Sequence, residues 1–294
     1  MPVSLAPRQS ERVIGPILQA LHAPIVVFAY KRPDKLLRLL DSLSLCPEAR
    51  SSDLFLFVDG SRSRDDVRLV AETVAVARRE SRFRSTSVVQ RTTNLGLVGS
   101  VTSGVSEMLA NHHRLIVLEE DLVVSPYFLR FMNDALEEYE AMDEVVSVHG
   151  YVYPVEDSLP ETFFLRGADC WGWGTWRRGW LIYRHDAVAL LRELVDAGRV
   201  EEFDFGGTYP FADMLKSQAE GNNDSWAVRW YASAFLAGKL TLYPNKPLVV
   251  NIGLDGSGTH GKGHGGSVKE LASEPIAVVA QDTVESQLAR QVFE

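Results

Sequence analysis

The sequence predicts a doubly wound α/β fold, in which a mostly parallel sheet carries helices on both faces. Short apolar runs alternate with amphipathic segments throughout residues 24–150. The runs are rich in β-branched and aromatic residues, which is typical of strands buried on both faces of a parallel sheet. Polar and charged residues stand where the runs stop, at the strand ends beyond which such sheets bind their ligands.

The first strands and helices of this fold follow one another in order. Pro24–Tyr30 is apolar and is expected to be a buried strand, which Lys31–Asp34 interrupt. Leucines then recur at helical spacing between residues 36 and 43 and predict an amphipathic helix. A second strand is expected over Leu54–Val58, and a charged helix over Asp65–Glu80.

The alternation of strand and helix continues to residue 150. Ser125 and Pro126 fit the N-cap and the first position of a helix. In order, the pattern predicts a strand over Ser87–Gln90, a helix over Ser100–Asn111, a strand over Arg114–Asp121, a helix over 126–142 and a strand over Val145–His149.

The second half of the chain has a different character. Aromatic residues gather over Phe163–Trp180, before an expected helix over Asp186–Ala197 and a late strand over Lys239–Tyr243. Asn251–Ser267 is so rich in glycine that we expect a loop there. These changes divide the chain into a leader over 1–22, an α/β half over 23–150, a second half over 151–267 and a tail over 268–294.

Composition excludes several classes of protein. The 294 residues carry a formal net charge of −9, which disfavours binding to nucleic acid or to anionic lipid. Cys46 and Cys170 are too few for a disulfide framework or a zinc cluster and are expected to be reduced thiols. No apolar run approaches the roughly 20 residues of a membrane helix, and residues 1–19 lack the pattern of a signal peptide. We expect a cytoplasmic protein, either free or peripheral at the inner face of a membrane.

Polar side chains mark the expected carboxyl ends of the strands. They are Arg32, Asp59, Arg91, Asn94 and the run Glu119–Asp121. An arginine there can face a phosphate or a base, and a carboxylate can accept a hydrogen bond from a base. The glycines after Asn94 form neither a P-loop nor a dinucleotide fingerprint.

Glu119, Glu120 and Asp121 are three carboxylates at the end of an apolar strand. Their mutual repulsion and desolvation would be relieved by a divalent cation, because Mg²⁺ and Mn²⁺ take carboxylate oxygens and bridge them to substrate phosphates. In a strand, residues 119 and 121 point to one side and residue 120 to the other. The alternative is an acidic strand end exposed to water.

Asp224 precedes a tryptophan-rich segment that is expected to be helical. A carboxylate in this place is either a general base or the N-cap of the helix. The glycine-rich loop carries His260, Lys262 and His264. Imidazole can ligate Mn²⁺ and lysine can meet phosphate, so the segment is either a lid over a bound diphosphate or a plain surface loop.

Four tryptophans lie within ten residues, together with Arg177 and Arg178. Aromatic rings stack on the apolar faces of sugars, and they also fill protein cores. Trp176 and Trp180 are at helical spacing and fit packing, whereas Trp171 and Trp173 fit the wall of a pocket. Arg177 is taken with them as a partner for anionic groups.

The order of these segments resembles that of GT-A glycosyltransferases of the GT2-like group, of bacterial type, and of the Golgi N-acetylglucosaminyltransferases. The resemblance covers residues 24–265. VVFAYKRPDKLLRLLDSL, LFVDG and LIVLEEDLVVSPYFLRF are similar to the family's first strand and helix, second strand and metal motif. They imply that Arg32 contacts the nucleotide, that Asp59 binds uracil, that Asp121 ligates Mn²⁺ and that Glu120 contacts the donor's ribose or sugar. We expect Arg91, Asn94, Glu119 and Lys262 to bind the donor as well.

The later segments extend the resemblance. CWGWGTW is similar to the family's wall of the sugar and acceptor site, NNDSWAVRW to the segment of its catalytic aspartate, and PLVVNIGLDGSGTHG to its C-terminal loop. They imply a catalytic role for Asp224 and a place near metal and diphosphate for His260. They also make 23–150 the nucleotide-sugar half and 151–267 the acceptor half.

The resulting hypothesis is an inverting transferase of hexosyl or N-acetylhexosaminyl groups. A nucleotide-diphosphate sugar, with UDP favoured, would donate to a hydroxyl of a glycan or lipid-linked acceptor, with Mn²⁺ or Mg²⁺ held by Asp121 and His260. The alternatives are a sugar-phosphate nucleotidyltransferase and a non-catalytic glycan- or nucleotide-binding module. The first lacks its expected phosphate loop after the first strand, where Tyr30–Pro33 stand. The sequence leaves the oligomeric state open.

Overall fold

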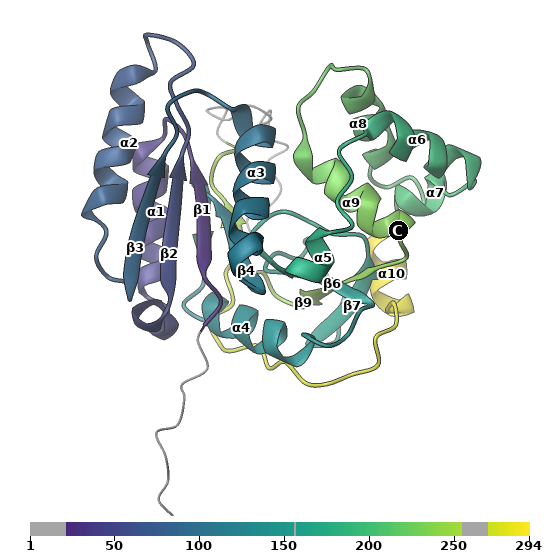
Figure 1. Ribbon diagram of the computed structural model, residues 1–294. Coiled ribbons are helices and arrows are strands. Elements are labelled where there is room, and N and C mark those ends of the chain that lie inside the picture. The colour runs from purple at the N-terminus through teal and green to yellow at the C-terminus, as the bar shows by residue number, and fades with distance from the viewer. Residues whose placement is uncertain (1–21, 156, 255–269) are drawn as a thin grey trace, which may run out of the picture.

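The computed structural model describes residues 22–155, 157–254 and 270–294. Its centre is an eight-stranded sheet in the order β3-β2-β1-β4-β8-β6-β9-β7 (Figure 1). The strands of this sheet are β1 (Ile25–Ala29), β2 (Asp53–Val58), β3 (Ser85–Gln90), β4 (Arg114–Glu119), β6 (Val145–His149), β7 (Thr162–Arg166), β8 (Trp173–Trp176) and β9 (Leu240–Pro244).

Six strands of the sheet run in one direction, and β8 and β7 run in the other. The pairs β3–β2, β2–β1, β1–β4 and β6–β9 are parallel. Strand β8 is antiparallel to both of its neighbours, β4 and β6, and β7 is antiparallel to β9. The expected α/β class with a mostly parallel sheet is confirmed, and the architecture is the one expected of a GT-A fold.

Helices cover both faces of the sheet. Alternate residues of β1 point to opposite sides. Val27 belongs to the apolar cluster that includes residues of α1 (Pro33–Ser44), α2 (Val67–Arg79) and α4 (Phe128–Glu138), and Phe28 belongs to the cluster that includes α3 (Gly96–Asn111). Every residue of β1 is buried, as its continuous apolar run predicts for a central strand. Edge strand β3 is partly exposed along its length.

A third apolar cluster lies at the β7 end of the sheet. It joins residues of β7 and β9 to helices that gather on one side of the molecule (Figure 1). These helices are α6 (Ala187–Asp196), α7 (Val200–Phe203), α8 (Phe211–Ala219), α9 (Trp226–Leu236) and α10 (Gln287–Phe293), while the short α5 (Arg177–Trp180) follows β8. In the described part of the chain, no helix has both the length and the apolar character needed to cross a bilayer.

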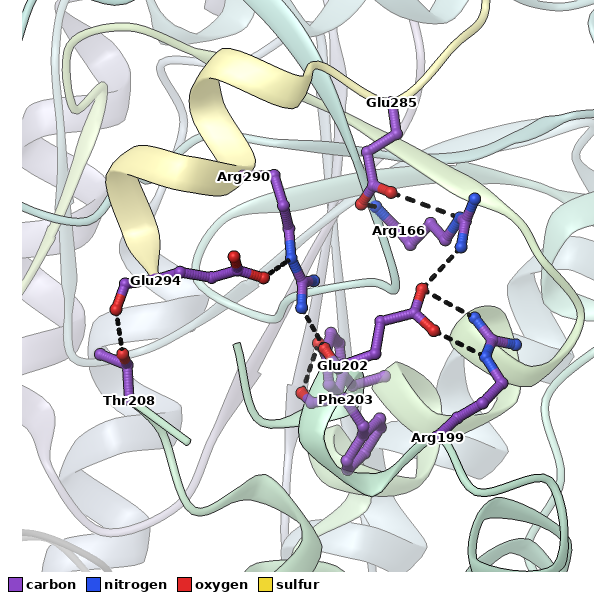
Figure 2. Close-up of polar contacts among 9 residues, drawn as sticks. Arg166, Arg199, Glu202, Phe203, Thr208, Glu285, Arg290 and Glu294 are labelled. Atoms are coloured by element: carbon purple, nitrogen blue, oxygen red, sulfur yellow. Dashed lines mark hydrogen bonds and ion pairs between the residues drawn. The ribbon is translucent and has the colours of Figure 1, made fainter. Parts of the chain in front are cut away.

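A polar network fastens α10 to the rest of this region (Figure 2). Glu202 accepts hydrogen bonds from Arg166 Nη1 (2.6 Å) and Arg199 Nε (2.8 Å). Arg166 also pairs with Glu285 (3.4 Å), and Arg290 donates to the backbone carbonyl of Glu202. The C-terminal segment is thereby tied to both β7 and α7.

The structure corrects the predicted start of α4. The helix begins at Phe128, so Ser125 and Pro126 lie before it and are not its N-cap and first residue. Ser125 is used differently, because its hydroxyl donates to the Ala272 carbonyl (2.7 Å) and its N–H to the Leu248 carbonyl (2.8 Å). These contacts hold Leu248 and Ala272 beside Ser125, whose hydroxyl also accepts the Tyr127 N–H (3.2 Å) just before the helix.

Several elements were not foreseen. Strands β7 and β8 lie within the aromatic segment, and β5 (Leu122–Val124) pairs with β10 (Val249–Asn251) in a separate two-stranded sheet. The predicted fourth strand therefore ends at Glu119, and the chain continues into β5 after a turn. Because of the β5–β10 pairing, the C-terminal loop starts beside Asp121.

Candidate functional site

The carboxyl ends of β1, β2 and β4 form one edge of the sheet. Their registers place Ala29 beside Val58, and Phe28 beside Glu119. The residues that follow these strands therefore meet. We call Arg32, Asp59, Glu119, Glu120 and Asp121 the charged end of the sheet edge.

Arg32 is placed by the junction of β1 and α1. Pro33 occupies the first turn of α1, and the residue before a proline is kept out of the helical conformation, so Arg32 has φ −123° and ψ 70°. Its Nε donates to Glu120 Oε1 (2.8 Å) and its Nη2 lies 3.0 Å from Asp121 Oδ2. Burial disfavours the charged guanidinium, but the charges of Glu120 and Asp121 outweigh that and raise the pKa of Arg32.

Glu119 is the third carboxylate of the charged end. Burial, together with the charges of Asp121 and Glu120, raises the pKa of Glu119 to about 8, although a hydrogen bond from Trp226 opposes the shift. Burial also raises the pKa of Glu120, although Arg32 opposes the shift, so the charged end combines two acids whose protonated forms are favoured with a guanidinium that Glu120 and Asp121 share. This explains how three adjacent acids are tolerated at the end of an apolar strand.

The donor set of this end fits a hard divalent cation in part. Carboxylate oxygens suit Mg²⁺ and Mn²⁺, which need only one or two protein carboxylates when substrate phosphates supply other ligands. Among residues 22–155, 157–254 and 270–294, no three His, Cys, Asp or Glu side chains form a complete cage. Asp121 Oδ2 already faces Arg32, so a cation at Asp121 would share that oxygen with the guanidinium or displace it.

The start of the C-terminal loop lies against Asp121. The Ile252 N–H donates to the Asp121 carbonyl (2.8 Å), and a Cβ at position 253 would come within 2.1 Å of Asp121 Oδ2. Only glycine fits there, which brings the backbone directly to the carboxylate. His260, Lys262 and His264 of this loop lie outside the described residues.

Asp59 is engaged by the chain itself. Its side chain accepts hydrogen bonds from Asn94 Nδ2 (3.0 Å) and from the N–H groups of Gly60 (2.9 Å), Leu95 (2.9 Å) and Gly96 (3.0 Å). These bonds hold the first turn of α3, where a carboxylate also meets the positive end of the helix dipole. A contact between Asp59 and a nucleobase would require one of the bonds to open.

Arg91 and Asn94 also make contacts within the chain. Arg91 pairs with Glu107 (3.2 Å) and lies over the Phe57 ring, 5.2 Å from its centroid. Asn94 donates to the Gly60 carbonyl as well as to Asp59. Both side chains thus connect the strand ends to α3, and their expected contacts with a donor stay predictions.

Asp224 is not the N-cap of α9. Ser225 is the cap, since its hydroxyl accepts the Val228 N–H. Asp224 is exposed. Its Oδ2 lies beside Gly96, because a Cβ atom built on that glycine would be 3.8 Å from this oxygen. The N-terminus of α9 therefore presents a carboxylate beside the loop that Asp59 holds. The N-cap role that the sequence left open for Asp224 is excluded, and the role of general base stays a prediction.

The structure corrects two of the expected pocket residues. Trp173 has no exposed surface and packs against Trp226 and Trp230, with ring centroids 5.4 and 5.9 Å away. Arg177 donates to the carbonyls of Leu109 and Ala110 at the end of α3. Both placements follow from the position of β8 between β4 and β6. This position encloses Trp173 in the core and directs Arg177 to the end of α3.

Trp171 lies on the same sheet edge, in a group of side chains that the sequence did not single out. Strand β6 ends at His149 and β9 at Pro244, parallel to each other, and β8 begins beside them. The rule that polar residues at the carboxyl ends of strands mark a ligand site could have indicated this group through His149, at the end of β6. Asp169 and Trp171 were missed because β8, which follows them, was not predicted. We call His149, Tyr151, Tyr153, Asp169 and Trp171 the aromatic end of the sheet edge.

Comparisons with known proteins return similar solved structures. No family model matches the chain, and no curated protein matches it significantly. Two solved chains of S. aureus TarS, a glycosyltransferase, are similar at 16% and 14% identity, with TM-scores of 0.33 and 0.41. They match 50% and 78% of this chain, which spans only 24% and 59% of theirs. Similarity this low does not define a function, and the likeness to the Golgi enzymes stays a prediction.

Proposed function

We propose that this protein is an inverting, divalent-metal-dependent glycosyltransferase that moves a sugar from a nucleotide-diphosphate sugar, with UDP favoured, to a hydroxyl of a glycan or lipid-linked acceptor. One observation carries the proposal. Two independent elements, the end of β4 and the N-terminus of α9, bring Asp121 and Asp224 to the same edge of an α/β sheet. Direct displacement at a sugar carbon needs charge stabilisation at the leaving group and one positioned base.

Asp224 is the proposed base. It is exposed, so an acceptor hydroxyl can reach it, and its backbone is held by the Ser225 cap of α9. It would accept the proton of that hydroxyl while the oxygen attacks the anomeric carbon. Trp226, two residues later, bonds to Glu119 and ties this helix to the charged end.

Asp121, with His260 as a second ligand, would hold Mn²⁺ or Mg²⁺. The cation would neutralise negative charge on the leaving diphosphate. Arg32 holds Glu120 and Asp121 in place, and its positive charge lies where phosphates would enter. The cytoplasmic location and a peripheral contact with a membrane are further parts of this proposal.

Calorimetry with UDP, GDP and dTDP, each with and without Mn²⁺, tests the proposal. We expect one nucleotide to bind, more tightly with Mn²⁺, and the matching nucleotide sugar to be slowly hydrolysed in water. Asp121→Asn should lose the effect of Mn²⁺, whereas Asp143→Asn, at an 84% exposed side chain, should keep it.

Each other outcome contradicts the proposal in a different way. Nucleotide binding without turnover of any nucleotide sugar would indicate a binding module. Formation of a nucleotide sugar from a nucleoside triphosphate and a sugar 1-phosphate would indicate a nucleotidyltransferase. An absence of nucleotide binding would remove the transferase altogether.

A further inference from the structure

Arg229 is a buried cation without a carboxylate partner. It lies in α9, with 3% of its surface exposed. Five described arginines have a buried side-chain nitrogen without a hydrogen bond, and four of them pair with a carboxylate: Arg32, Arg91, Arg114 and Arg290. Arg229 forms no such pair in the part of the chain that the structure describes. Because a buried charge without a counter-charge is costly, this guanidinium needs an anion beside it.

The two unpaired nitrogens of Arg229 form one edge of the guanidinium. Nε and Nη2 are both buried, and neither finds a hydrogen-bond partner among the described residues. Nη1, in contrast, lies 3.2 Å from Nε2 of His185 and 3.3 Å from the His185 carbonyl oxygen. The N–H groups of Nε and Nη2 point in the same direction, so this edge can donate two parallel hydrogen bonds to one carboxylate or phosphate. The unpaired edge is therefore the one that suits an oxyanion.

The segment from Tyr183 to His185 lies along Arg229. Ser233, one turn further along α9, accepts the Arg184 N–H (3.0 Å), and this bond holds the segment against the helix. The Tyr183 hydroxyl is a second buried group without a hydrogen-bond partner among the described residues, and it can donate to an anion. His185 is exposed and Tyr183 is partly exposed. The guanidinium thus lies directly beneath surface side chains, and a ligand reaches it by displacing an exposed imidazole.

This group of side chains lies on the Asp224 side of the sheet edge. Burial raises the pKa of Tyr183, the charge of Arg229 opposes the shift and the charge of Asp224 adds to it. The carboxylates of the charged end do not contribute. An anion beside Arg229 would therefore avoid the repulsion of the charged end, and the exposed position of Asp224 lets water and salt screen the one carboxylate nearby.

We infer that Arg229 and Tyr183 form a binding site for an oxyanion, a phosphate or carboxylate group, which the Nε–Nη2 edge of the guanidinium holds. The group belongs to a ligand other than the proposed nucleotide donor, because the site is apart from the charged end, where metal and diphosphate are proposed to bind. Only this second statement rests on the proposed function. Buried water is the competing occupant, since it satisfies polar groups but leaves the positive charge of Arg229 without a counter-ion.

An NMR titration of the arginine Nε–H signals tests the site directly. The probes are sodium phosphate and sodium acetate, each titrated against sodium chloride at constant ionic strength, and Arg229→Met identifies the Arg229 signal by its absence. We expect at least one of the two anions to shift this signal to saturation, with UDP and Mn²⁺ present as well as without them. Tyr183→Phe should weaken that anion by about fivefold, the scale of one hydrogen bond. Arg68→Met, at a 75% exposed side chain, should bind it as the wild type does.

Thermal unfolding of Arg229→Met tests the unpaired charge itself. In chloride, this variant should melt at a temperature no lower than that of the wild type, because an apolar side chain replaces a buried charge that has no counter-charge. Addition of the anion that binds should raise the melting temperature of the wild type and of Arg68→Met, but not that of Arg229→Met. A large loss of stability in chloride would show that the chain itself compensates the guanidinium, and would contradict the site.

Three results of the titration would overturn the inference: neither anion shifts the Arg229 signal to saturation, Tyr183→Phe binds the anion as tightly as the wild type, or UDP with Mn²⁺ displaces the anion. The first would leave water as the occupant, and the third would place the anion in the site of the donor diphosphate. Tyr183→Phe removes only an unpaired hydroxyl, so it keeps the test valid if Arg229→Met fails to fold. A protein that binds an anion here but no nucleotide would keep this site and lose the proposed transferase.

Discussion

The charged end and the aromatic end share one sheet edge but differ in how their polar groups are satisfied. At the charged end, Arg32 holds two carboxylates, and Asp59 accepts hydrogen bonds from three residues at the start of α3 and from the adjacent Gly60. At the aromatic end, Asp169 keeps an oxygen to which no described residue donates. The polar groups of the charged end are therefore engaged by contacts within the chain, whereas the aromatic end keeps one carboxylate oxygen that no described residue engages.

The largest effect is expected from Trp173, which lies in β8 between the two ends and has no exposed surface. Trp173→Ala should lower the free energy of unfolding by about 3–5 kcal/mol, through lost burial and a new cavity. Trp171→Ala removes a partly exposed ring and should cost clearly less. Urea denaturation measures both, and equal losses would mean that the two tryptophans are not divided between core and surface as described.

The second effect tests how tightly the charged end is closed. Arg32→Met leaves Glu120 and Asp121 buried beside each other without a counter-charge, and should destabilise the protein by about 3 kcal/mol. The matched control is Arg68→Met, whose ion pair with Glu72 is exposed and should contribute less than about 1 kcal/mol. If the two variants melt at the same temperature, Arg32 does not hold the charged end together.

The third effect separates stability from chemistry at the start of α9. Ser225→Ala removes the N-cap and should cost about 1 kcal/mol. Asp224→Asn changes an exposed side chain and should alter stability by less than about 0.5 kcal/mol, while sugar transfer falls by orders of magnitude. Transfer by Asp224→Asn at the wild-type rate would show that this carboxylate is not the base.

The smallest effect concerns the pH dependence of the aromatic end. Burial lowers the pKa of His149 below its ordinary value of 6.5. As the pH falls below 6.5, the unfolded chain therefore takes up a proton that the folded protein refuses, and stability decreases until the lowered pKa is passed. His149→Gln should flatten this part of the curve of unfolding free energy against pH, and the exposed His113→Gln should not. Identical curves for all three proteins would contradict the buried neutral ring.

Much of the first half could be predicted from local patterns. The apolar runs correctly indicated β1, β2, β4 and β6. Four of the five leucines of α1 are buried at the spacing that predicted the helix, and Leu37 is exposed. The rule that ligands bind at the carboxyl ends of parallel strands also directed attention to Arg32, Asp59 and Asp121, which the structure brings together. These features depend on periodicity within about ten residues, which a sequence displays directly.

The aromatic segment resisted this approach. Strand β8 contains two tryptophans, a glycine and a threonine, which show no alternation because both of its faces are covered. Its antiparallel insertion between β4 and β6 is decided by residues far away in the chain. As a result, Trp173 and Arg177 were misplaced in a pocket, and the polar group around Asp169 was not found.

By itself, the sequence determined the α/β class, the order of the first strands and the positions at which charged residues leave them, because short-range hydrophobic spacing encodes burial. Tertiary structure alone decided which of those residues are already engaged, that Ser225 rather than Asp224 caps α9, and that β8 brings an aromatic group to the same edge. Such partners are separated by tens of residues, and only the folded packing of the sheet selects among them.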